Sequence, residues 1–119
     1  MQYMLLIYGD EKAGMAMTPE EQESSMGEWF RYTEDLRSSG AMAAGDALQP
    51  TMTATTVSQP NGGDALITDG PFAETREQLG GYYLLNVADL DEAIAWAKKC
   101  PGARTGKIEL RPVMEFDQG

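Results

Sequence analysis

The 119 residues fit one domain, and Asp and Glu outnumber Lys and Arg by 19 to 9, which gives a formal net charge of −10. This charge disfavours binding to nucleic acid or to an anionic membrane surface. The chain has no histidine and one cysteine, which excludes Ser-His and Cys-His nucleophile pairs, histidine-ligated metal sites and an internal disulfide. We therefore expect residues 1–119 to form a single domain without a metal site.

Residues 3–8 are apolar at every position, which is typical of a strand buried on both faces. The polar stretch up to Met17 predicts a loop. Thr18 followed by Pro19 and Glu21 predicts a helix start with a capping box, and Gly40 suits the left-handed position after the helix. The stripe that this helix is expected to bury consists of Met26, Trp29, Phe30, Thr33 and Leu36.

Residues 41–48 predict a strand that is interrupted by Gly45. The threonine-rich stretch 51–58 and residues 65–68 flank the turn at 60–63, so this part of the chain predicts a hairpin. Residues 69–72 then break the extended pattern, and the polar segment 73–78 follows.

Residues 82–87 predict a second strand with apolar side chains on both faces. Asp89 is the predicted cap of a second helix, Glu92 stands at capping-box spacing, and Pro101 ends the helix. The side chains that this helix is expected to bury are Leu90, Ala93, Ile94 and Ala97. A last strand is predicted from the alternation of Ile108, Leu110 and Met114.

Without the hairpin, the order of elements is β-α-β-β-α-β, the ferredoxin-like arrangement, in which two helices cover one face of an antiparallel sheet. The predicted fold class is therefore α+β with an inserted hairpin. Two helices cannot cover both faces of strands that are apolar on both sides. We expect a second copy of the chain to cover the remaining face in a homodimer.

Four segments resemble the YCII-related, DGPF-domain family. These are residues 3–8 (YMLLIY), 68–75 (TDGPFAET), 77–83 (EQLGGYY) and 110–113 (LRPV). The resemblance covers nearly the whole chain, and its central segment is the most specific part.

The resemblance implies a dimeric α/β barrel, in which two ferredoxin-like sheets close against each other around a cavity. The wider superfamily holds monooxygenases, isomerases and dehalogenating enzymes that act on small molecules. Most members of the DGPF branch have no assigned reaction, and many are encoded beside extracytoplasmic-function sigma factors, which suggests a role in bacterial stress signalling. The YCII branch uses a suggested His–Asp pair, of which only the aspartate has a candidate here, Asp69.

The segment Asp69-Gly70-Pro71-Phe72 has two interpretations. In the first it is a turn, in which Asp69 bonds to nearby backbone, Gly70 adopts unusual dihedrals, Pro71 fixes φ and Phe72 fills the core. In the second it lies at the mouth of the dimer cavity, with Asp69 as a general base or a polar anchor for a ligand. Both interpretations stay open on the sequence.

Other side chains are candidates for ligand binding. Arg76 can clamp a carboxylate or form part of a solvated, ion-paired surface. Tyr8, Tyr82 and Tyr83 can line a cavity or pack at the dimer interface, and only one of the adjacent pair can face a given side. Arg111 is predicted to lie on the face opposite Leu110, where it would bind an anion or meet solvent.

Three functions fit these observations. The first is binding of a small organic molecule, with isomerase-like or lyase-like acid–base chemistry led by Asp69. The second is a ligand sensor without catalysis, and the third is an accessory dimer without a cavity. The chain has no Gly-rich phosphate loop and nothing in it requires flavin or haem, so no cofactor is expected.

The predicted location is the cytoplasm. The apolar start has no basic segment before it and meets Gly9-Asp10 too early for a signal peptide. No apolar run approaches the roughly 20 residues that span a bilayer. A lone cysteine, Cys100, is typical of a reducing compartment.

Overall fold

The fold is built on one antiparallel sheet of four strands. The computed structural model describes residues 1–116. Strands β1 (Gln2–Gly9) and β5 (Gln78–Asn86) lie at the centre, and β2 (Met42–Ala47) and β6 (Lys107–Pro112) form the edges, in the order β2-β5-β1-β6. Every neighbouring pair is antiparallel. This α+β arrangement is compatible with the predicted ferredoxin-like fold.

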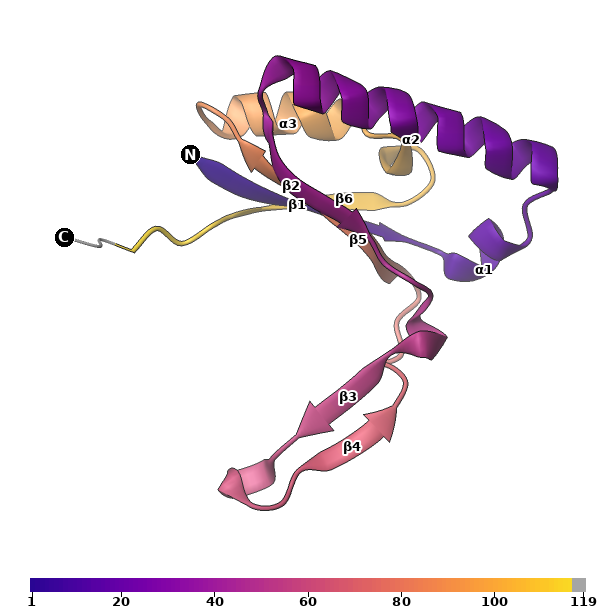
Figure 1. Ribbon diagram of the computed structural model, residues 1–119, viewed down its shortest axis with the longest axis vertical. Coiled ribbons are helices and arrows are strands. Elements are labelled where there is room, and N and C mark those ends of the chain that lie inside the picture. The colour runs from indigo at the N-terminus through magenta and orange to yellow at the C-terminus, as the bar shows by residue number, and fades with distance from the viewer. Residues whose placement is uncertain (117–119) are drawn as a thin grey trace.

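Helices α2 (Pro19–Ser39) and α3 (Leu90–Lys99) both lie on one side of this sheet (Figure 1). The predicted capping box is present, because the Glu21 amide donates to the Thr18 hydroxyl at 3.2 Å and the Thr18 amide donates to the Glu21 carboxylate at 3.1 Å. Gly40 ends α2 with a φ of 82°. Asp89 caps α3 by accepting the Glu92 amide at 2.9 Å. Three short 3₁₀ turns complete the helical elements: η1 (Thr51–Thr53), η2 (Pro60–Gly62) and η3 (Pro101–Ala103).

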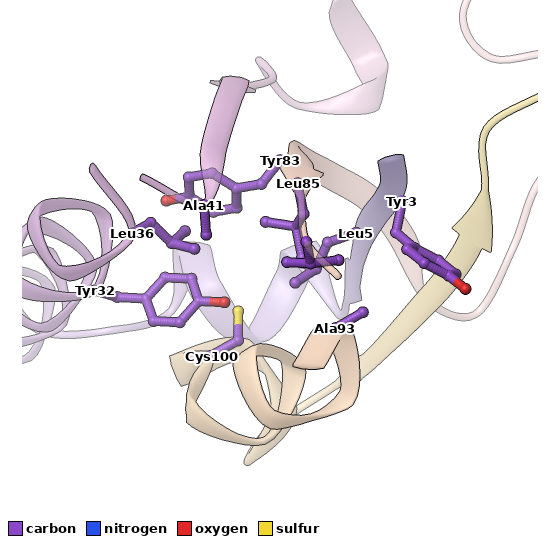
Figure 2. Close-up of a cluster of buried hydrophobic side chains, with 10 residues drawn as sticks. Tyr3, Leu5, Tyr32, Leu36, Ala41, Tyr83, Leu85, Ala93 and Cys100 are labelled. Carbon is purple, nitrogen blue, oxygen red and sulfur yellow. The ribbon is translucent and has the colours of Figure 1, made fainter. Parts of the chain in front are cut away.

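The core lies between these helices and the sheet, and Tyr32 stands at its centre. The Tyr32 hydroxyl donates to the Trp96 carbonyl of α3 at 2.8 Å, and its ring packs edge-on against the ring of Tyr83 with the centroids 5.6 Å apart. Figure 2 shows Tyr32 directed toward Cys100, with Leu5 and the other buried side chains of β1 and β5 alongside. Tyr32 therefore links α2, α3 and the sheet.

Two expectations for the first third of the chain are wrong. Residues before Met17 do not form only a loop, because Asp10 accepts the Lys12 amide and caps a short helix, α1 (Glu11–Met15). The buried stripe of α2 is also rotated. Met26 and Phe30 are 59% and 70% exposed. Tyr32, which was not predicted to be buried, faces the core instead, because its hydroxyl bonds to Trp96 and its ring packs against other aromatic rings.

The second half of the chain departs from expectation in similar ways. In α3 the small side chain of Ala93 is fully buried, whereas Leu90 and Ile94 are exposed, because the helix packs closely on the sheet through its alanine side. Met114 lies beyond β6 and is exposed. Strand β5 begins at Gln78 rather than at residue 82, since its ladder with β1 continues past a bulge.

The second face of the two central strands is also apolar, as predicted, whereas the edge strands place charged side chains on that face. Strand register places Leu5 beside Tyr83 and Leu110 on the face toward the helices. The alternate positions Met4, Leu6 and Leu84 therefore point the other way, and no helix lies over them in Figure 1. We call this surface the open face.

The predicted hairpin is present and stands away from the sheet. Strands β3 (Thr55–Ser58) and β4 (Leu66–Asp69) pair only with each other, and every residue of β4 is exposed. Figure 1 shows this hairpin on the side of the sheet opposite the helices. The Cα radius of gyration is 16.7 Å, against about 13.5 Å for a compact chain of this length. We call residues 54–72 the arm.

The core predicts a loss of stability in alkali. Burial is the main cause that raises the pKa of Tyr32, Tyr83 and Cys100 above their ordinary values. The unfolded chain therefore releases these protons first as the pH rises, and the free energy of unfolding should fall above about pH 9 by up to about 1.4 kcal/mol per pH unit for each group. Urea unfolding followed by circular dichroism between neutral and alkaline pH measures this slope. Cys100→Ala should reduce it, and a free energy that is constant or rises with pH would contradict the prediction.

Candidate functional site

An open cavity of about 640 Å³ lies between α2 and the sheet. Its outer wall is a stripe of α2 that differs from the buried one. The residues of this stripe are Met26, Phe30, Thr33, Glu34 and Arg37. Their spacing of three and four residues places them along one side of the helix. The stripe is apolar at its N-terminal end and polar at its C-terminal end, so it gives the cavity two chemically different ends.

Glycines form part of the cavity floor. Gly45 of β2 pairs with Tyr83, and Gly81 of β5 pairs with Ile7, so both glycines belong to the face beneath α2. A Cβ atom at position 45 would lie 2.6 Å from Cδ1 of Tyr83. Glycine at this position therefore lets the Tyr83 ring approach the backbone of β2.

The polar end of the cavity combines two hydroxyls and a guanidinium. Oγ1 of Thr33 and Oη of Tyr83 lie 2.6 Å apart and share a hydrogen bond. Burial raises the pKa of Tyr83, so its phenol stays protonated at neutral pH and acts as a hydrogen-bonding group rather than a base. Arg37 stands one turn further along α2 and forms no ion pair within residues 1–116. This end can bind a polar or anionic group of a ligand.

The rim of the cavity is joined to the root of the arm. Glu11 of α1 lines the cavity, and its carboxylate accepts hydrogen bonds from the Thr51 amide at 2.7 Å and the Thr51 hydroxyl at 2.8 Å. The Glu11 amide donates to the Gln78 side chain at 3.0 Å. These three contacts fix where the chain leaves the body to form the arm.

Two predicted site residues border this cavity. Tyr8 and Tyr82 are among the residues that line it, but strand alternation directs their side chains toward the open face. The Tyr82 hydroxyl donates to the Asp46 carboxylate at 2.8 Å, and this bond raises the pKa of Tyr82. The adjacent Tyr83 is the tyrosine that faces α2, so the pair divides between the two faces as expected.

The segment 69–72 lies on the arm, outside this cavity in the same chain. Gly70 has a φ of 98°, and its amide donates to the Ala54 carbonyl, as the turn interpretation requires. The expectation that Phe72 fills the core is wrong, since its side chain is 90% exposed beyond the end of β4. Pro71 is exposed. The expected bond from Asp69 to nearby backbone is not present, because its carboxylate accepts no hydrogen bond from any residue between 1 and 116.

The two predicted arginines also lie outside the cavity. Arg76 is exposed in the segment between the arm and β5. Arg111 lies on the open face, as alternation predicted, and its guanidinium pairs with Glu109 at 3.1 Å. Sequence reasoning missed Phe30 and Thr33 as cavity residues because it assigned them to the core. The glycine within strand β2 was a visible signal that another group, the Tyr83 ring, approaches the backbone closely there.

Nearly the whole chain matches one protein family. The family model for the YCII-related domain matches residues 1–117. The chain belongs to the YCII-related family. A relative from Rhizobium meliloti (strain 1021), described as an uncharacterized protein, is 36% identical over 121 residues, and the match covers 100% of this chain and 97% of the relative.

The described part of this YCII-related chain offers no metal-binding cluster. Within residues 1–116, no three or more His, Cys, Asp and Glu side chains stand close enough together to hold a metal ion. In the same part of the chain, no helix has both the length and the apolar character needed to cross a membrane.

The glycine floor leads to a prediction about Gly45→Ala. The added methyl group would displace the Tyr83 ring and weaken its bond to Thr33, so we expect a loss of about 1–3 kcal/mol in the free energy of unfolding. Gly14→Ala is the matched control, because a Cβ atom at that helical position meets nothing within 4 Å. Urea unfolding measures both variants, and an equal effect of the two would contradict this account of the floor.

Proposed function

We propose that this protein binds a small organic molecule with an apolar body and a polar end in the cavity beneath α2. The volume of about 640 Å³ lies within the range of ligand-binding pockets, about 300–1,000 Å³. The observation that carries the proposal is the second stripe of α2, which stands over a floor partly made of glycine.

The chemistry of the two ends supports this ligand class. Phe30 and Met26 keep most of their apolar surface in solvent, and covering this surface with a ligand would be favourable. At the other end the Thr33–Tyr83 hydroxyl pair and the unpaired Arg37 provide donors for a carboxylate, carbonyl or hydroxyl group. The ligand would lie along α2 with its polar group toward the C-terminal end of the helix.

Binding fits the geometry better than acid–base catalysis led by Asp69. The Asp69 side chain lies on the exposed arm of its own chain, and Tyr83 is held in its protonated form. Neither of these two groups is a base that faces the cavity of its own chain. We therefore favour ligand binding over an isomerase or lyase reaction led by Asp69.

We further propose that the protein is a homodimer joined through the open face. Met4, Leu6 and Leu84 are only half-buried in a single chain. Two such faces related by a twofold axis would pack as sheets about 10 Å apart, and each would cover the other. This arrangement leaves the cavity beneath α2 on the outer side of each sheet.

The neutral dye N-phenyl-1-naphthylamine is a suitable probe for the cavity, because its fluorescence rises in apolar surroundings and the acidic protein does not repel it. We expect saturable binding of one dye molecule per chain. Phe30→Ala should weaken this binding by about fivefold or more, because it removes an aromatic wall.

Phe116→Ala is the matched control for this measurement. Phe116 is 73% exposed, close to the 70% of Phe30, but it does not line the cavity. Dye binding that is absent in the unaltered protein, or that is equal in the two variants, would overturn the proposed binding site.

The dimer is tested by Leu84→Arg, which places a charge on the open face. We expect the unaltered chain to sediment as a dimer at micromolar concentration and this variant to sediment as a monomer, since two buried guanidiniums would meet across the twofold axis. Ile94→Arg on the exposed side of α3 is the control and should remain dimeric. Analytical ultracentrifugation distinguishes these outcomes, and a monomeric unaltered chain would contradict the proposal.

A further inference from the structure

The arm exposes apolar side chains that nothing in its own chain covers. Val57, Leu66 and Ile67 are 64%, 56% and 71% exposed. They lie in the half of the hairpin nearer its tip, where Val57 pairs with Ile67. A two-stranded hairpin is marginally stable on its own and gains stability when an apolar surface packs against it. These features indicate that another surface covers the arm.

The direction of the arm indicates where that surface is. Figure 1 shows the arm on the side of the sheet that carries the open face, away from α2 and α3. The open face and the arm thus lie on the same side of the sheet. A second copy that packs on the open face would lie beside the arm, and by twofold symmetry its own arm would pass alongside the first copy.

The charge of the arm favours a second copy as the partner. The only charged residues between positions 51 and 73 are Asp64 and Asp69, although 24% of the whole chain is charged. A segment with so little charge can approach another strongly acidic chain with little repulsion.

The arm is long enough to reach the helix layer of a second copy. The extended stretch from Ala54 to Gln59 spans about 17 Å at about 3.3 Å per residue, and the 3₁₀ turn η2 at the tip adds about 2 Å per residue. The gap between two packed sheets is about 10 Å, and a helix adds about 10 Å more. On that outer layer stand the exposed Met26 and Phe30 of the cavity wall.

We infer that the arm of each copy covers the α2 cavity of the other copy, so that each ligand site is built from two chains. Val57 and Ile67 of one chain, which pair on one face of its hairpin, would pack near Met26 and Phe30 of the second. This inference rests on the proposed binding site and on the proposed dimer. It accounts for two exposed apolar surfaces at once, because each would bury the other.

Complementation between two defective variants tests this arrangement. Ile67→Asp alters the arm and Phe30→Ala alters the cavity, and both positions are exposed in a single chain, so each variant should fold. Each variant alone should bind N-phenyl-1-naphthylamine about fivefold or more weakly. A mixed dimer, purified through a different tag on each chain, contains one site that joins the intact cavity of one chain to the intact arm of the other.

We expect the mixed dimer to bind the dye with full affinity at about half of its sites, as the symmetry of exchanged arms requires. If the arm covered the cavity of its own chain, each site would carry one defect and no site would regain full affinity. That result would overturn the inference, as would unaltered dye binding by the Ile67→Asp homodimer.

Cross-linking separates this inference from the proposed function. A Phe30→Cys chain mixed with an Ile67→Cys chain should give a cross-linked dimer with a short bismaleimide, whereas Phe30→Cys mixed with Phe116→Cys should not. Cys100 is buried and leaves the reaction to the introduced thiols. Cross-linking without dye binding would contradict the ligand site alone. Dye binding without cross-linking would contradict the position of the arm.

Discussion

The structure depends on strands that are apolar on both faces while helices cover only one. Leu5 on β1 faces α2 and α3 and is completely buried, whereas the adjacent Leu6 points to the open face and is only half-buried. A polar residue at such a position would have given an ordinary sheet with one solvated face. The open face, apolar along β1 and β5, is the surface on which we propose that a second copy packs, and the arm lies on the same side of the sheet.

The cavity follows from how α2 meets this sheet. Tyr32 fixes the rotation of the helix, because its hydroxyl bonds to α3 and its ring packs against Tyr83. With that rotation, Phe30 and Thr33 stand beside the core rather than in it. Gly45, which has no side chain, lines the sheet side of the cavity next to the Tyr83 ring. The same contacts that stabilise the core therefore also leave the cavity beside it, without any further element of structure.

The sequence predicted the features that are encoded locally. The capping box of Thr18 and Glu21 and the left-handed Gly40 depend only on neighbouring residues, and the alternation along β1 requires only its own side chains. It did not predict which side of α2 is buried, because that choice depends on a hydrogen bond between Tyr32 and a carbonyl 64 positions away. For the same reason, the aromatic character of Phe72 suggested a core position, although the arm carries it away from the core.

The sheet closes before the arm begins. The Leu48 amide donates to the Gly80 carbonyl at 2.9 Å, so the ladder between β2 and β5 is complete at that point without any residue of the hairpin. Folding of the sheet is thus separated from the length of the intervening insertion, since doubling the length of a flexible loop costs only about 0.6 kcal/mol. The hairpin insertion can therefore be lengthened, shortened or replaced while the four-stranded sheet keeps its register.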